Sequence, residues 1–94
     1  MNKKYELKPT DLTAPNGKPL FRVVAIRDVR FGVSKGAKGG LVESEKNLDH
    51  DGDAWVFGDA QVFGDAQVYG DAWVYGNARV FGDALVSGNA RVSG

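Results

Sequence analysis

The sequence predicts an all-β chain in which many short strands stack into a solenoid. Residues 53–94 divide without a gap into seven six-residue units that follow the pattern [DN]-A-x-V-[FYS]-G. Ala and Val alternate with their neighbours, so they share one face of an extended segment. The Gly and the Asp or Asn that follows it are typical turn residues. Because a strand of about four residues is not stable alone, each copy must stack on another.

The inward-facing positions of the solenoid follow directly from this alternation. The larger interior residue of each unit is Val56, Val62, Val68, Val74, Val80, Val86 or Val92. The smaller one is Ala54, Ala60, Ala66, Ala72, Ala78, Ala84 or Ala90. The two remaining strand positions of each unit point outward, and we expect them to form the surface of the solenoid.

The segment before the repeat is predicted to close one end of the core. Lys3–Lys8 is predicted as a short strand, Pro15–Gly17 as a turn and Leu20–Asp28 as the clearest conventional strand. Asn47–Gly52 fits the six-residue frame weakly, with Leu48 at the Ala position, and is expected to begin the first coil.

The expected organisation is one compact domain. Residues 1–46 form an N-terminal β cap segment, and residues 47–94 form the repeat. A chain of 94 residues allows a single small domain.

The repeat resembles the hexapeptide repeat of left-handed parallel β-helix proteins, on the Val and Ala positions given above. This resemblance implies a left-handed, triangular coil of three units, or 18 residues. Residues 20–28 and 39–48 resemble the head of uncharacterised phage and prophage hexapeptide-repeat proteins. That second resemblance implies a biological context and no chemistry.

Aromatic residues occupy outward positions on one predicted side of the coil. In an 18-residue coil, Trp55 lies next to Trp73 and Phe57 next to Tyr75. Four outward aromatic side chains on one side of a small solenoid are typical of an interaction face, since large exposed apolar patches usually mark interfaces. The alternative is an aromatic ladder that only stiffens the stack. The face is covered either by the N-terminal strand or by a second copy, and the sequence leaves both open.

The last units predict self-association. Asn89–Gly94 is as regular as the first unit, and a solenoid normally needs a polar cap. The C-terminal end contact is therefore expected at Val86, Ala90 and Val92, because exposed strand edges favour further pairing. The symmetry of this homo-oligomer stays open, as does the alternative that the sequence is a piece of a longer repeat.

Charge and composition exclude several classes of function. The chain has 12 basic and 12 acidic residues, so binding to nucleic acid is not expected. Residues 1–46 have ten basic and five acidic side chains, a balance of +5, and residues 47–94 have two and seven, a balance of −5. No apolar run approaches the length of a membrane span, and Met1–Glu6 lacks the start of a secretory signal. We expect a cytoplasmic protein, in the host cytoplasm if a phage encodes it.

Catalytic, cofactor and metal sites are not expected. The chain has no Cys, and its one histidine, His50, stands at the edge of the repeat. The resemblance includes acyltransferases that use a histidine base and a protruding loop, and carbonic anhydrases that bind zinc through three histidines. Residues 53–94 have no such loop and one histidine cannot hold zinc in that way. Asp65 and Asp83 stack in one corner column, where they are expected to act only as turn residues.

These observations predict a non-catalytic structural or protein-interaction module that self-associates through its solenoid end or its aromatic face. The first alternative is a phage-encoded inhibitor that docks on a host protein through its acidic surface. The second is a degenerate acyltransferase-like subunit that needs a partner for activity.

Overall fold

The chain is all-β, as predicted, and its described residues form ten strands and a single turn of 3-10 helix. The computed structural model describes residues 3–29 and 32–93. The N-terminal elements are β1 (Tyr5–Thr13), β2 (Pro19–Ala25), β3 (Lys38–Val42) and the 3-10 helix η1 (Glu45–Asn47). The strands of the repeat are β4 (Trp55–Val56), β5 (Gln61–Val62), β6 (Gln67–Val68), β7 (Trp73–Tyr75), β8 (Arg79–Val80), β9 (Leu85–Val86) and β10 (Arg91–Ser93).

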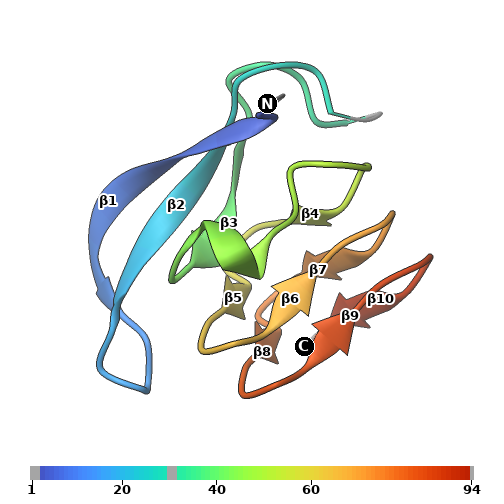
Figure 1. Ribbon diagram of the computed structural model, residues 1–94. Helices are drawn as coiled ribbons and strands as arrows, with labels where there is room; N and C mark the ends of the chain where they lie inside the picture. Colours follow the sequence, from blue (N-terminus) through green and yellow to red (C-terminus); the bar gives the residue numbers. More distant parts are fainter. Residues whose placement is uncertain (1–2, 30–31, 94) are drawn as a thin grey trace.

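The repeat strands stack in three parallel columns, which form the sides of a solenoid (Figure 1). Valine pairs with valine in each column, and partners are 18 positions apart. We call β5, β6 and β7 the second coil and β8, β9 and β10 the third coil. Backbone hydrogen bonds join the coils, as when the N–H of Gln61 donates to the carbonyl of Ala78 at 2.9 Å. This pairing keeps every predicted Val column continuous.

The first coil begins earlier than the repeat pattern indicates. Val42 of β3 pairs in parallel with Val62, and Leu48 forms an isolated parallel bridge with Val68. The first coil therefore consists of β3, Leu48 and β4. Leu48 occupies the Val position, so its predicted place at the Ala position is wrong. The reason is that Val56 lies eight positions after Leu48, instead of six, which shifts the frame before the first regular unit.

The N-terminal hairpin extends one side of the solenoid. β1 and β2 are antiparallel, β2 is antiparallel to β3, and the resulting sheet has the order β1-β2-β3-β5-β8. The tight turn between β1 and β2 contains Gly17 at φ 84°, in the left-handed region that glycine tolerates. In Figure 1 this hairpin stands beside the stacked coils, and the segment between β2 and β3 lies over one end of them.

The interior is filled by the predicted aliphatic side chains. The Val residues from Val56 to Val80 and the Ala residues from Ala54 to Ala78 are buried. The hairpin adds Tyr5, Val23 and Ala25 to the same core cluster. In the first coil Gly40 takes the small position, and a Cβ there would lie 2.4 Å from Cγ1 of Val56. That position accepts no side chain, so the start of the core is packed as closely as the repeat itself.

Candidate functional site

An aromatic pocket on the side formed by β4, β7 and β10 is the first candidate. It has a volume of about 370 Å³ and is lined by Phe57, Trp73, Tyr75 and Arg91. We call it the aromatic pocket. The rings of Phe57 and Trp73 are tilted against each other at 5.7 Å, and the Arg91 guanidinium lies 4.7 Å from the centre of the Trp73 ring. The stacking of residues 73 and 91 in neighbouring strands places this cation over the indole.

Three of the four predicted face residues meet in this pocket, and Trp55 does not. Trp55 is only 1% exposed and belongs to the buried core. Its indole meets the Tyr5 ring edge-on at 6.3 Å, and a Cβ on Gly39 would come within 3.0 Å of it. The N-terminal elements therefore cover this end of the predicted aromatic face. The sequence pattern places Trp55 outward correctly but does not show which segment packs over it.

The third coil is the second candidate surface. Among the predicted contact residues, Ala90 is exposed, Val92 is half-buried and Val86 is buried in the core. Phe81 and Leu85 are 59% and 62% exposed, although neither was among the residues predicted for this end. The repeat pattern predicted that both side chains point outward. In the structure Phe81 stacks on Phe63 and Leu85 pairs with Gln67, in the register that the repeat predicts.

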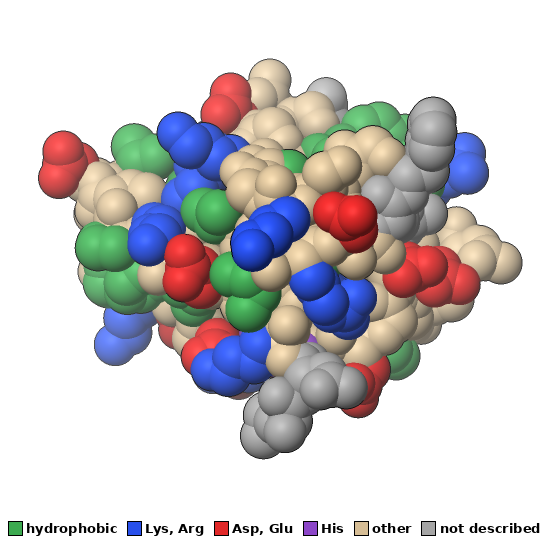
Figure 2. Space-filling model, turned by 90° about the horizontal axis from the view of Figure 1, so that it is seen from above, with side chains coloured by type: hydrophobic (Ala, Val, Ile, Leu, Met, Phe, Trp, Pro, Cys, Tyr) green, Lys and Arg blue, Asp and Glu red, His purple; other side chains and the backbone are tan. Residues whose placement is uncertain are grey.

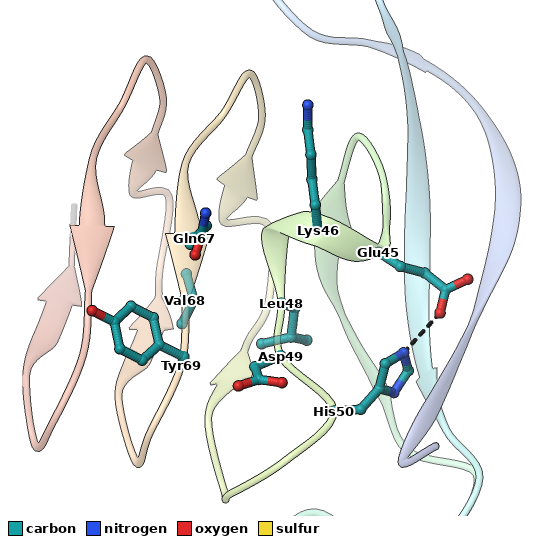
Figure 3. Close-up of a pocket in the computed structure, with 8 residues that line it drawn as sticks. All are labelled: Glu45, Lys46, Leu48, Asp49, His50, Gln67, Val68 and Tyr69. Atoms are coloured by element: carbon teal, nitrogen blue, oxygen red, sulfur yellow. Dashed lines mark hydrogen bonds and ion pairs between the residues drawn. The ribbon is translucent and has the colours of Figure 1, made fainter. Parts of the chain in front are cut away.

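A polar pocket of about 420 Å³ lies on the side formed by Leu48 and β6 (Figure 3). Its central contact is the 2.7 Å hydrogen bond between Nε2 of His50 and Oε1 of Glu45. Nδ1 of His50 accepts the backbone N–H of Lys4 at 3.2 Å, and the imidazole stacks on the Tyr5 ring at 4.0 Å. Because a backbone N–H can only donate, this geometry assigns the hydrogen of the neutral imidazole to Nε2.

The side chains of this polar pocket do not converge on a shared point. Figure 3 shows Lys46 pointing away from the Glu45–His50 pair, and Tyr69 on the opposite side of the pocket from it. Lys46 is paired with Asp65 at 2.9 Å. Both ring nitrogens of His50 are engaged in structural contacts, so the imidazole holds the N-terminal strand against the first coil.

Membrane-spanning helices and metal clusters are both missing from the described part of the chain. None of the helical residues within 3–29 and 32–93 forms a segment long and apolar enough to cross a bilayer. Over the same residues, His, Asp and Glu side chains do not gather in groups of three or more that would suit a metal ion.

Basic and acidic side chains alternate at the end of the molecule where the N-terminal elements lie. Figure 2 looks down on this end and shows Lys and Arg side chains with Asp and Glu side chains between and around them. Exposed Lys3 lies 3.4 Å from Glu45, and Lys8 lies 3.1 Å from Glu6.

The Glu45 carboxylate makes the stability of the protein depend on pH. The hydrogen bond from His50 is the main reason why the pKa of Glu45 lies below its usual value, and Lys3 lowers it further. A carboxyl with a lowered folded-state pKa contributes stability above its unfolded pKa of about 4.3, and the contribution is lost as the pH falls through the folded-state pKa. Because the side chain is half exposed, we expect less than about 1 kcal/mol.

We therefore expect Glu45→Gln to be less stable than the wild type at pH 5 and to match it more closely at pH 3. Urea unfolding at both pH values measures this difference. Parallel loss of stability in the two proteins between pH 5 and pH 3 would show that Glu45 does not carry the effect.

Comparison with known protein families finds a similarity within the repeat. Residues 60–76, 66–80 and 72–88 match the YdcK beta solenoid repeat. The matched stretch lies in the second and third coils and supports a β-solenoid built from repeats. Among curated proteins, no match to this chain is found.

Proposed function

We propose that this chain is a non-catalytic structural and protein-interaction module that self-associates. The observation that carries the proposal is the third coil, which presents the exposed side chains of Phe81, directly after β8, and Leu85, in β9. Within residues 3–29 and 32–93, β8, β9 and β10 each pair with a strand on one side only. Open strand edges beside exposed apolar groups favour pairing with another chain.

The fold that fits this proposal is the left-handed triangular β-helix with 18 residues per coil and an N-terminal β cap. The 18-residue offset between paired strands supports the coil length. Three parallel columns support the triangular cross-section. The antiparallel hairpin of β1 and β2 on β3 supports the cap.

The aromatic pocket favours a second candidate function, the docking of a different protein. Aromatic side chains and Arg are enriched where proteins bind one another, and the pocket combines three rings with one guanidinium. In this case the third coil binds a second copy of the chain and the aromatic pocket binds a different protein. Substitutions in one surface should then leave binding at the other unchanged.

Sedimentation velocity from low to high micromolar concentration tests self-association. We expect the weight-average mass to rise above the 10.1 kDa of one chain as the concentration increases. Ala90→Lys places a charge on an exposed side chain of the third coil and should return the protein to a monomer. Trp73→Ala empties the aromatic pocket and should leave the oligomer intact.

Two outcomes of this experiment count against the proposal. A 10.1 kDa monomer at every concentration removes self-association altogether. Loss of the oligomer in Trp73→Ala but not in Ala90→Lys assigns the contact to the aromatic pocket instead of the third coil.

A further inference from the structure

Two backbone carbonyls of the first coil, on the side that faces away from the repeat, are occupied by one side chain of the N-terminal segment. Between coils, Trp55 donates its N–H to Ala72 and Ala54 donates to Gly70. The corresponding carbonyls one coil earlier belong to Ala54 and Gly52. The Lys4 ammonium donates to both, at 2.7 Å to Ala54 and 3.2 Å to Gly52. One buried lysine therefore supplies the donors that a preceding coil would supply.

The other two sides of the first coil are closed in different ways. The Tyr5 hydroxyl donates to the carbonyl of Leu48, and also to that of Glu45 at 3.1 Å. In the next coil the equivalent carbonyl, that of Val68, receives the N–H of Asp49 at 2.9 Å. On the third side β2 pairs with β3. Each side of the first coil thus has a partner from the N-terminal segment: Lys4 beside β4, Tyr5 beside Leu48, and β2 beside β3.

The third coil, in contrast, has backbone N–H groups that face away from the rest of the solenoid. Gln61, Gln67 and Trp73 of the second coil donate their N–H groups to Ala78, Ala84 and Ala90. By the same register, the N–H groups of Arg79, Leu85 and Arg91 face away from the second coil. An edge strand in this position presents N–H and C=O groups alternately, so it pairs with another strand in either direction.

Charge does not oppose the meeting of two third coils. Residues 77–93 contain two basic residues and one acidic residue, Arg79, Arg91 and Asp83. The second coil, residues 59–76, contains three Asp and no basic residue. Two third coils therefore meet with little net repulsion, and Asp83 of one copy is available to the arginines of the other.

Starting from the proposed self-association, we infer that its partner is a second copy of this chain bound third coil to third coil, in a closed two-fold dimer. A head-to-tail stack requires free acceptors on the first coil, and Lys4 and Tyr5 hold them. A two-fold contact uses the same surface on both copies, so it ends at two chains. The N-terminal elements β1 and β2 of each copy stay outside the contact.

Single-cysteine variants test this arrangement cleanly, because the chain has no cysteine of its own. Ser93→Cys places a thiol at the end of β10, and Ser34→Cys places one in the exposed segment between β2 and β3. With a bismaleimide reagent that spans the width of the third coil, we expect Ser93→Cys to give a covalent dimer and Ser34→Cys to remain a single chain. The double variant should give dimers and no longer ladder.

The results separate this inference from the function on which it rests. A ladder of trimers and larger species from the double variant establishes head-to-tail stacking and overturns the inference, while self-association stands. An oligomer by sedimentation without a Ser93→Cys dimer also overturns it. A monomer by sedimentation overturns both.

Discussion

Val68→Asp is expected to unfold the chain. Val68 is fully buried in the middle coil and pairs with both Leu48 and Val86, so a carboxylate there has water on no side. A buried charge without a partner costs several kcal/mol. A folded chain of this length has a stability of only about 5–14 kcal/mol. We expect loss of the cooperative urea transition and of the far-ultraviolet β signal in circular dichroism.

Gln67→Asp is the matched control, because Gln67 precedes Val68 on β6 and its side chain is exposed. The same carboxylate on the outside of the same strand should change stability by less than about 0.5 kcal/mol. A folded Val68→Asp protein with the stability of Gln67→Asp would mean that the Val column does not fill the interior.

Tyr5→Ala is expected to lower the free energy of unfolding by about 3–5 kcal/mol, the range for removing a buried aromatic side chain. The Tyr5 ring is 1% exposed, stacks on His50 and meets Trp55 edge-on. Its hydroxyl donates to two carbonyls of the first coil. Burial raises the pKa of this phenol, so the hydroxyl stays protonated and able to donate at neutral pH.

Two further variants divide the effect of Tyr5 into its parts. Tyr5→Phe keeps the ring and should lose about 1–2 kcal/mol, from the carbonyls left without a donor. Tyr75→Ala removes a tyrosine that is 37% exposed and should lose much less than Tyr5→Ala. Urea unfolding measures all three proteins. Equal losses from Tyr5→Ala and Tyr75→Ala would contradict a closing role for Tyr5.

The sequence was sufficient to predict the repeat because its chemistry is local. Each six-residue unit contains its own strand, interior pair and turn, so the Val and Ala columns and the outward register followed without knowledge of other segments. The match to a β-solenoid repeat within residues 60–88 agrees with this part of the prediction.

The start of the solenoid was not predictable in the same way. Val42 keeps the Val position but lies outside the consensus units, Leu48 replaces the consensus Val, and two additional residues before Val56 shift the frame. Lys4 and Tyr5 act on carbonyls more than 40 positions away, and no periodic pattern marks such contacts. For the same reason the burial of Trp55 was not visible, since the segment that covers it is far away in sequence.

Asn47 connects the irregular start of the solenoid, at η1, with the regular coils of the repeat. Its side-chain amide donates to the carbonyls of Gly64 and Ala66, at 3.3 and 2.8 Å. Its side-chain oxygen accepts the N–H groups of Glu43 and Ser44. In the regular coils, backbone N–H groups serve the corresponding carbonyls, as when Gln67 donates to Ala84. The 3-10 turn at η1 thus interrupts the strand pattern without leaving these carbonyls unpaired.

The bond from Lys4 to Ala54 has a consequence for the order of events during folding. It joins residues 50 positions apart, whereas neighbouring strands of the repeat are 18 positions apart. Closing the longer loop costs about 0.9 kcal/mol more in chain entropy. Lys4 is synthesised before Ala54, so it must wait for its partner. We therefore expect the coils to stack on one another first, and Lys4 to reach its final position after them.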